Sequence, residues 1–517
     1  MRFENSMRNV AVAWLGQALS VLMSFVARGV FAHLLSSDYL GLESLFANVL
    51  TILSLAELGV GSAIVFSLYK PLAENDTAQV KALMRLFKRA YIVIGVSVAV
   101  VGCALTPFVD VIIKDVPDIP LIKLYFLMFV ANTSVSYFFS YKGSLIAADQ
   151  KKYIVSLVQY SFQILMCIAQ VAVLLATHNY LLFLVCMVSS TLLQNIVISA
   201  VADRMYPFLR QRDVDPIDPQ TLTSIKKNVF ALIVHKVAGV AGNPANSIII
   251  SAFVGLTPLG AYGNYMLVIN SLTRIMDQTF DAITAPVGNL GVTESKDYQY
   301  SVFRTCFFVN AFIYSVISIG LLCLFNPFIA FAFGERYVFP FYLEALIVLL
   351  FFLKGMRTAA LTFTTAYGLF WFTKWKAVVE TVVLLACSIV LVQVWGITGV
   401  VVSGLISTTL VSSVWEGFML CKHGFERSSK RYFAMFYLYV AFALLLAAVA
   451  FGLCALVPFG GVPGFLVKGV IALVISVGGF VAAFHRTQAF AQTVDLAKRF
   501  AAKLFGKIGG LSRKANR

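Results

Sequence analysis

Long apolar runs follow one another along nearly the whole chain, separated by short polar connections. A helix needs roughly 20 apolar residues to cross the hydrocarbon core of a bilayer. The runs that reach this length cover residues 9–34, 41–69, 90–113, 120–147, 153–177, 180–204, 228–254, 258–288, 302–325, 338–368, 376–395, 398–421, 432–457 and 464–485. This pattern predicts an all-α integral membrane protein with about fourteen transmembrane helices.

Lys and Arg residues are concentrated in alternate connections. With the N-terminus in the cytoplasm, the inner segments hold about 30 of the 40 basic residues, in agreement with the positive-inside rule. The outer connections hold about four: Lys114, Lys123, Arg336 and Lys468. This asymmetry predicts that both termini are cytoplasmic.

Two parts of the chain resemble each other at a constant offset of about 219 residues, a sign of an internal repeat. Residues 31–41 correspond to residues 250–260, and Ala63-Ile64 corresponds to Ala282-Ile283. Repeated halves are typical of alternating-access transporters. The predicted divisions are a six-helix N-lobe (1–206), a cytoplasmic linker (207–227), a six-helix C-lobe (228–421), two further apolar helices (432–485) and a basic, amphipathic cytoplasmic tail (486–517).

The composition excludes several classes of function. Hydrophobic residues make up 60% of the chain and charged residues only 12%. In a soluble protein, about a quarter of the residues are charged. The net charge of +16 comes from short loops between apolar runs, which favours contact with anionic lipid headgroups over nucleic acid. The eight cysteines are scattered, so neither a zinc site nor a disulfide framework is indicated. The chain has no hydrolase triad, phosphate-binding loop or metal cluster, and the start lacks the features of a cleaved signal peptide.

Basic residues inside the predicted spans are the strongest functional signal. Each would cost about 2.5–3.5 kcal/mol if it faced lipid at the middle of the bilayer. We therefore expect them to face a watery cavity that accepts an anionic guest. The six residues are Arg28, Lys142, Lys236, Arg274, Lys354 and Arg357.

Uncharged polar residues lie at helical spacing beside these cations. Amide and hydroxyl groups of this kind suit sugar hydroxyls, and the guanidinium fork suits phosphate. The first predicted span carries Gln17, Ser20, Ser24 and Arg28 on one face, and the eighth carries Asn270, Arg274, Asp277, Asp281 and Thr284. The predicted substrate-binding residues are Arg28, Lys236, Arg274, Lys354, Arg357, His235, Gln159, Gln163 and Asn270.

Carboxylates inside the predicted spans form a second set. A buried carboxylate can carry a proton or help to bind Na⁺, which would couple transport to an ion gradient. The candidates are Glu57, Asp277, Asp281 and Glu380, and no other cofactor is expected.

Structural roles remain open for many of these residues. Polar stripes also hold transmembrane helices together. Arg274 and Asp277 are spaced so that they could neutralise each other, and Arg28 and Lys142 are near enough to span ends to reach the interface. Lys354 and Arg357 have no acidic residue within one turn.

The chain resembles the Wzx-type polysaccharide flippases of the multidrug/oligosaccharidyl-lipid/polysaccharide (MOP) exporter superfamily. The resemblance extends along essentially the full length. It rests on the order and spacing of RGVFAHLL at 28–35, YLGL at 39–42, SLYKPL at 67–72, YGNY at 262–265, VGNL at 287–290 and WGITGV at 395–400.

This resemblance implies two six-helix lobes that rock between inward-open and outward-open states. It implies a bacterial inner-membrane protein that moves undecaprenyl-pyrophosphate-linked oligosaccharide repeat units to the outer leaflet. The implied partners are this lipid-linked oligosaccharide, membrane lipids, and the polymerase and chain-length proteins of polysaccharide synthesis.

Three alternatives remain open at this stage. A lipid II flippase of the same superfamily would share a basic cavity. A MATE-like cation-coupled exporter would favour acidic residues in its cavity, whereas basic residues are more numerous here. A membrane-embedded sugar polymerase or ligase would be an enzyme with a substantial outer loop, which the chain lacks. Our hypothesis is that Arg28, Arg274, Lys354 and Arg357 line one cavity and bind pyrophosphate and acidic sugars.

Overall fold

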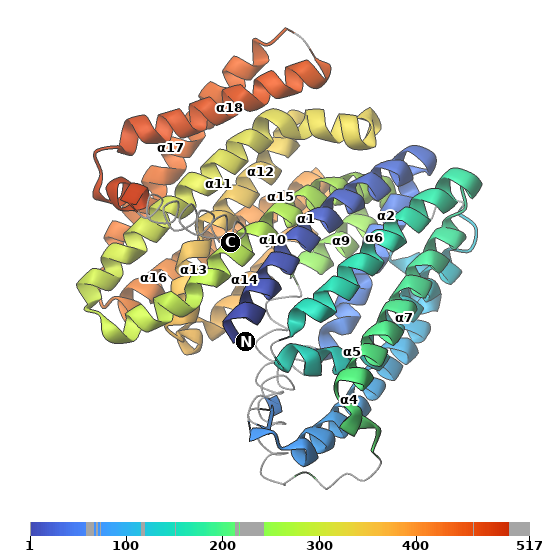
Figure 1. Ribbon diagram of the computed structural model, residues 1–517. Helices are drawn as coiled ribbons and strands as arrows, with labels where there is room; N and C mark the ends of the chain where they lie inside the picture. The colour runs from blue at the N-terminus through green and yellow to red at the C-terminus, as the bar shows by residue number, and fades with distance from the viewer. Residues whose placement is uncertain are drawn as a thin grey trace, which may run out of the picture. The chain divides into compact units, whose positions relative to one another are not determined.

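The computed structural model describes most of the chain, and all of its regular structure there is helical (Figure 1). The described residues are 2–57, 67–68, 71–72, 74–114, 119–149, 151–211, 217, 242–458 and 460–495. Within these ranges, eleven helices are long and apolar enough to cross a membrane, and Pro244–Phe253 is a shorter apolar helix. The prediction of an all-α protein with many membrane spans is confirmed.

Each of the fourteen predicted spans contains a helix in the part that the structure describes. In the first half the helices are α1 (Arg2–Leu34), α2 (Ser37–Leu53), α4 (Thr77–Leu105), α5 (Ile122–Ala148), α6 (Lys152–Thr177) and α7 (Tyr180–Met205). Short 3₁₀ segments follow three of them: η1 (Ser54–Glu57), η2 (Thr106–Val111) and η3 (Pro207–Arg210). The count of fourteen spans and the cytoplasmic termini stay predictions.

The second half contains longer and more irregular helices. They are α9 (Gly242–Phe253), α10 (Leu256–Thr293), α11 (Lys296–Phe333), η4 (Glu335–Tyr337), α12 (Phe341–Met356), α13 (Thr358–Ala366), α14 (Phe370–Trp395), α15 (Ile397–Ile406), α16 (Val414–Met419), α17 (Lys430–Ala455) and α18 (Gly461–Phe484). Two π-helical segments, η5 (Ser407–Ser413) and η6 (Leu420–Gly424), flank α16. The predicted span 398–421 is therefore a continuous helix that contains π-helical turns.

Local chemistry explains several helix ends. The side chain of Asp76 accepts a hydrogen bond from the backbone N–H of Gln79, and Asn179 caps α7 in the same way. Gly334 and Gly396 follow α11 and α14 with φ of 107° and 57°. This left-handed conformation ends a helix, and it favours glycine because glycine has no Cβ.

The helix ends in the two halves of the sequence agree with the predicted repeat. The hydrogen-bonded residues Asp38 and Thr257 are 219 positions apart. The same offset relates the ends of α1 and α9, at Leu34 and Phe253, and the starts of α2 and α10. The repeat is therefore visible in the helix boundaries as well as in the sequence.

The chain folds as two compact units. Unit 1 consists of Met1–Met266, Ala330–Tyr337 and Leu385–Val400, and unit 2 consists of Leu267–Ile329, Val338–Leu384 and Val401–Arg517. Most of the predicted linker 207–227 and most of the tail 486–517 lie outside the described residues. The predicted division into lobes and tail stays a prediction.

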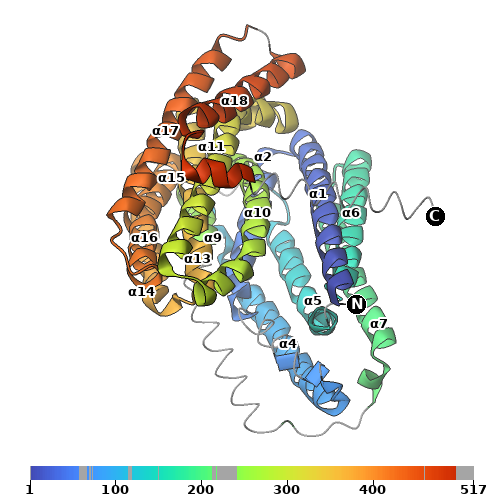
Figure 2. The same cartoon turned by 60° about the vertical axis from the view of Figure 1, so that its left-hand side comes forward.

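Aromatic side chains fill the core of unit 2. Phe303 and Phe307 stack with their ring centroids 5.7 Å apart, and both contact Tyr432 on α17. Phe308 on α11 contacts Phe480 and the neighbouring Phe484 of the helix pair α17–α18, which lies side by side in Figures 1 and 2. The pair is thus attached to α11 by aromatic packing.

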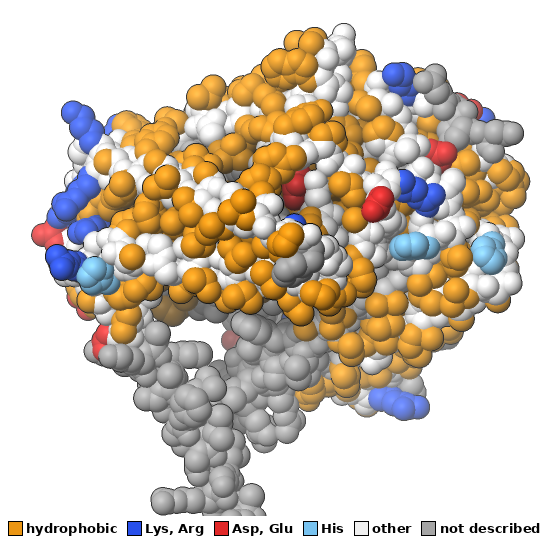
Figure 3. All heavy atoms as spheres, turned by 90° about the horizontal axis from the view of Figure 1, so that it is seen from above, with side chains coloured by type: hydrophobic (Ala, Val, Ile, Leu, Met, Phe, Trp, Pro, Cys, Tyr) orange, Lys and Arg blue, Asp and Glu red, His pale blue; other side chains and the backbone are white. Residues whose placement is uncertain are grey.

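The face of the molecule drawn in Figure 3 is largely apolar, as contact with lipid requires. Hydrophobic side chains dominate the face drawn in Figure 3, and charged side chains appear there at separate points. Exposed leucines and valines run along α17 and α18, among them Leu445 at 59% and Val474 at 60% exposure. A patch of this kind on a protein surface marks contact with lipid or with another protein.

We predict that Gly355→Ala destabilises the chain. A Cβ at Gly355 would lie 2.0 Å from the ring of the buried Tyr314, so the ring or the helix must move. Overpacking of a core of this kind costs about 1–3 kcal/mol. The thermal unfolding midpoint in detergent, followed by intrinsic fluorescence, should fall. Gly320→Ala is the control, because nothing lies within 4 Å of the added carbon; an equal effect of both changes would contradict the packing.

Candidate functional site

The predicted site residues are distributed over both compact units. Unit 1 contains Arg28, Glu57, Gln159 and Gln163, and unit 2 contains Asn270, Arg274, Asp277, Asp281, Lys354, Arg357 and Glu380. His235 and Lys236 lie outside the described residues.

Arg28 on α1 is held by side chains of α2 and α10. Its Nε donates to Oδ1 of the buried Asn264 at 2.7 Å, and its Nη2 donates to Ser44 Oγ at 3.4 Å. Its Nη1 lies 3.5 Å from Glu43 Oε2, and only 15% of the side chain is exposed. Arg28 therefore points into unit 1 rather than toward the membrane–water interface. Arg28, Glu43, Ser44 and Asn264 are called the Arg28 cluster below.

A glycine makes room for the Arg28 cluster. A Cβ at Gly263 would lie 2.8 Å from Arg28 Nη2 and 2.5 Å from Ser44 Oγ. Glycine is therefore the residue at this position that lets the guanidinium lie against α10.

Other polar residues of unit 1 join neighbouring helices. Lys142 Nζ lies 2.8 Å from Asp203 Oδ1 and donates to Ser199 Oγ, so this cation connects α5 to α7. Gln170 donates to the carbonyl of Phe183 on α7. Lys142 and Gln170 therefore join helices of unit 1, and for Lys142 this differs from the sequence-based alternative that it reaches the membrane interface.

The remaining unit 1 candidates differ in exposure. On α6, Gln159 is exposed and Gln163 is half-buried. Glu57 at the end of η1 is half-buried, and its Oε1 accepts a hydrogen bond from Tyr91 on α4 at 3.3 Å.

A polar stripe on α10 is exposed. Asn270, Arg274, Asp277 and Asp281 lie three or four positions apart, which places them on one helix face, and all four are exposed. No ion pair joins Arg274 to Asp277, although both belong to the described residues. We call these four residues the α10 stripe.

Lys354 and Arg357 have different surroundings although they are one turn apart. Lys354 lies in the last turn of α12 and is exposed. Arg357 lies at the junction of α12 and α13 and is buried, with 6% of its surface accessible.

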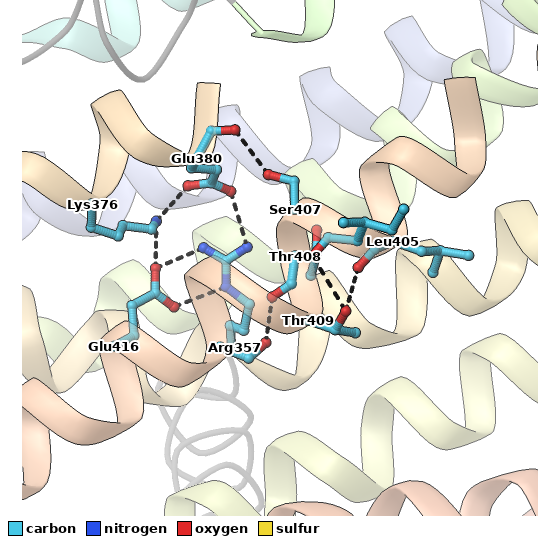
Figure 4. Close-up of polar contacts among 10 residues, drawn as sticks. Arg357, Lys376, Glu380, Leu405, Ser407, Thr408, Thr409 and Glu416 are labelled. Carbon is cyan, nitrogen blue, oxygen red and sulfur yellow. Dashed lines mark hydrogen bonds and ion pairs between the residues drawn. The ribbon is translucent and has the colours of Figure 1, made fainter. Parts of the chain in front are cut away.

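Two carboxylates from other helices bind Arg357 (Figure 4). Arg357 Nε and Nη2 donate to the two carboxylate oxygens of Glu416 on α16 at 2.8 and 2.6 Å. Arg357 Nη1 lies 3.5 Å from Glu380 Oε1 on α14. The guanidinium thus forms a two-point fork on Glu416 and a longer contact with Glu380.

Lys376 completes a four-residue network of alternating charge, which we call the Arg357 network. Its Nζ lies 2.8 Å from Glu380 Oε2 and 2.5 Å from Glu416 Oε1. Ser407 Oγ of the π-helical η5 donates to the backbone carbonyl of Glu380 at 2.9 Å. Two cations and two carboxylates therefore balance one another where α12–α13, α14 and α16 meet.

Charges in an apolar interior are tolerated when they are paired and hydrogen-bonded. The Arg357 network meets this condition, since the side chain of Glu416 is 1% exposed and that of Lys376 is 12% exposed. The geometry gives Arg357 a role in joining helices, whereas Lys354 and Arg274 of unit 2 are exposed at the surface.

Sequence reasoning missed Glu416 and Lys376. Lys376 could have been found, since it precedes Glu380 by four positions and such pairs face each other on a helix. Glu416 is an acidic residue inside a predicted span, and that alone was a reason to seek a partner for it. Its pairing with Arg357, 59 residues away, follows only from the tertiary fold.

Among the residues that the structure describes, no group of three His, Cys, Asp or Glu side chains could hold a metal ion.

Comparison with known proteins identifies related sequences and folds. A family model described as polysaccharide biosynthesis protein matches residues 6–280, about half of the chain. No curated protein matches the chain.

Several solved structures share the fold. The lipid II flippase MurJ in an inward closed conformation has 11% identity and a TM-score of 0.65, over 92% of this chain and 98% of that chain. An inward-facing multidrug resistance MATE family transporter of the MOP superfamily has 13% identity and a TM-score of 0.59, over 77% and 93%. A MOP superfamily transporter from Pyrococcus furiosus has 11% identity and a TM-score of 0.53, over 82% and 95%. The likeness to these structures confirms the fold that the resemblance to MOP exporters implies.

We predict that Glu416→Gln destabilises unit 2 strongly. The change removes the negative charge of residue 416 and one of its two acceptor oxygens, so the longer contact with Glu380 is the ion pair left to Arg357. Breaking a buried ion pair in this way costs about 3–5 kcal/mol. Chemical or thermal unfolding in detergent would measure the loss. Adding Arg357→Met to the same chain should recover part of it, because the unpaired charge is then removed.

Lys123→Gln provides the comparison for this prediction. Its ion pair with Asp110 has a short distance of 2.7 Å but is 53% and 44% exposed, so its loss should cost less than about 1 kcal/mol. Equal losses for Glu416→Gln and Lys123→Gln would show that burial of the Arg357 network does not matter.

Proposed function

The chain belongs to the polysaccharide biosynthesis protein family, and from this premise we propose that it is a lipid-linked oligosaccharide flippase. Its cargo would be undecaprenyl-pyrophosphate-linked oligosaccharide repeat units, carried from the cytoplasmic to the outer leaflet of a bacterial inner membrane. The fold supports this proposal, since the structural neighbours are a lipid II flippase and transporters.

The exposed α10 stripe is the observation that carries the proposal. An Arg side chain in contact with lipid at mid-membrane would cost about 2.5–3.5 kcal/mol. Arg274 lies within a predicted span, is exposed, and has no ion pair with Asp277. Its environment is therefore expected to be water or a polar ligand, and its fork suits a phosphate.

Further groups would extend this site toward the sugars. Asn270 is one turn from Arg274 and is exposed, and Gln159 on α6 of unit 1 is a separate exposed amide. Amides donate and accept hydrogen bonds, which matches the many hydroxyls of an oligosaccharide. Lys354 supplies a second exposed cation, and the proposed substrate-binding set also includes Arg28, Gln163, His235, Lys236 and Arg357.

Alternating access is the proposed mechanism, because inserted charges and a large polar head group cannot cross the hydrocarbon core unaided. Coupling to a gradient of H⁺ or Na⁺ would supply direction. Asp277 and Asp281 are the leading candidates, because both are exposed carboxylates on the α10 stripe. Glu380 already lies against Arg357 and Lys376, and Glu57 is hydrogen-bonded to Tyr91, so both are weaker candidates.

Two other cargoes fit the same fold. Lipid II also has a lipid pyrophosphate and differs in its head group, so it competes directly with the proposed oligosaccharide. A cationic drug would instead use Asp277 and Asp281. Polymerase and chain-length proteins are proposed partners in polysaccharide assembly, and the basic tail 486–517 would contact anionic lipids.

We predict that Arg274→Glu or Lys354→Glu abolishes cargo movement. Each change replaces an attraction for pyrophosphate by repulsion and should lower the translocation rate at least about tenfold. The measurement is appearance of undecaprenyl-pyrophosphate oligosaccharide on the outer face of proteoliposomes, with the amount of inserted protein determined in parallel. Surface polysaccharide in cells that depend on this chain should be lost in the same way.

Lys123→Glu is the matched control, because it reverses an exposed cation that pairs with Asp110 outside the proposed site. Unchanged translocation by both Arg274→Glu and Lys354→Glu would remove the two residues from the site. Parallel assays with lipid II and with a cationic dye decide among the three cargoes. Movement of lipid II or of the dye without movement of the lipid-linked oligosaccharide would overturn the proposal.

For ion coupling, we predict that Asp277→Asn and Asp281→Asn each reduce translocation only when a gradient is imposed. A neutral amide cannot carry the proton or the cation charge, so the acceleration by the gradient should fall about tenfold or more. Rates in proteoliposomes with and without H⁺ and Na⁺ gradients measure the effect. If both variants respond to the gradients as the parent does, neither carboxylate takes part.

A further inference from the structure

The contacts between the two sequence repeats in unit 1 are reciprocal. Thr257 donates a hydrogen bond to Asp38, its own counterpart at an offset of 219. A Cβ at Gly41 would lie 2.2 Å from the carbonyl oxygen of Leu256, and a Cβ at Gly260 would lie 2.8 Å from the carbonyl oxygen of Ser37. These two contacts exchange places when the repeats are exchanged, which is the property of an interface with two-fold symmetry.

The same exchange relates two basic residues to the C-terminal ends of two helices. Arg336, in η4 after α11, donates to the carbonyls of Ala32 and Leu35, the latter at 3.0 Å. Lys114, after η2, donates through Nζ to the carbonyl of Phe253 at 3.0 Å and through its backbone N–H to that of Ser251 at 3.1 Å.

The two arms contact equivalent positions of the repeat, although Lys114 and Arg336 themselves are 222 positions apart. Ala32 and Ser251 are counterparts at the offset that relates Asp38 to Thr257. Lys114 belongs to the first repeat and caps α9 of the second, while Arg336 belongs to the second repeat and caps α1 of the first. Cations are favourable at helix C-termini, where the last carbonyls have no partner within the helix. All these residues lie in unit 1.

From this arrangement we propose that Lys114 and Arg336 form a pseudo-symmetric clasp, the outer clasp, which holds the two repeats together at the end of unit 1 predicted to face outward. Release of cargo to the outer leaflet then requires both arms to leave their helix ends. The role in release rests on the proposed function, whereas the closure of this end does not.

The test measures how fast a cysteine reacts when it is placed on α2, one turn beyond the contacts that this helix makes with the second repeat. Asp38, Gly41 and Ser44 follow one face of α2, and Asn48 is the next position on that face. Asn48→Cys is labelled in intact cells with a membrane-impermeant maleimide. The labelling is counted as the increment over the same chain without Asn48→Cys, since eight native cysteines are present.

Lys114→Gln and Arg336→Gln should each raise the labelling rate of the introduced cysteine about threefold, and the double variant about tenfold, since each removes one favourable helix-end charge. Lys114→Arg and Arg336→Lys keep a donor and should label as slowly as the parent, which separates loss of the clasp from misfolding. Lys123→Gln is the matched control, because it is a basic residue of the same predicted outer side that pairs within the first repeat.

Equal labelling of the parent and the double variant, or an equal rise in Lys123→Gln, would overturn the clasp. Rapid labelling of the Asn48→Cys chain that keeps Lys114 and Arg336 would also overturn the clasp, because this end of unit 1 would then be open with both arms in place. The labelling needs no cargo, so a failed translocation assay with normal clasp results counts against the proposed function alone.

Discussion

The fold of unit 2 depends on the requirement that charge inside an apolar environment be neutralised at short range. Arg357 meets this requirement through the fork on Glu416, and Lys376 and Glu380 complete the balance. Because these residues come from α12–α13, α14 and α16, the requirement fixes how three helical segments meet. The π-helical segments on both sides of α16 belong to the same arrangement, since a π turn carries an extra residue and changes the direction in which the following side chains point. Aromatic packing around Phe303 and Phe307 then fills the space beside this polar joint.

The same requirement separates cations that are paired with carboxylates from cations that are exposed. Lys142 and Arg357 have carboxylates at hydrogen-bonding distance, and each connects helices. Arg28 is intermediate, because Glu43 lies at 3.5 Å while Asn264 and Ser44 orient the guanidinium. Arg274 and Lys354 are exposed within predicted spans. Unit 2 therefore contains both a buried cation paired with carboxylates and cations exposed at its surface.

Much of the fold follows from the sequence, because apolar runs of membrane length and the positions of Lys and Arg depend on local composition. The offset between the repeats was also readable, and the ends of α1 and α9 agree with it. The partners of Arg357 were not, since helical periodicity relates residues three or four positions apart whereas Glu416 is 59 positions away. The α10 stripe was predicted because its residues share one helix face, and its exposure could be learned only once the neighbouring helices were in place. The π-helical turns within the predicted span 398–421 leave no mark in hydropathy.

Because the two repeats belong to one chain, counterpart positions in them can carry different residues. In a symmetric pair of half-length chains, an Asp at position 38 would face a second Asp, and like charges would repel. Here the counterpart is Thr257, so one side accepts a hydrogen bond and the other donates it. Ser44 likewise lies against its own counterpart, Gly263. Because Gly263 has no Cβ, space is left for the guanidinium of Arg28. The counterpart of Arg28 in the second repeat is Ser247. The contact between the repeats therefore holds one positive charge, where strict symmetry would place two close together.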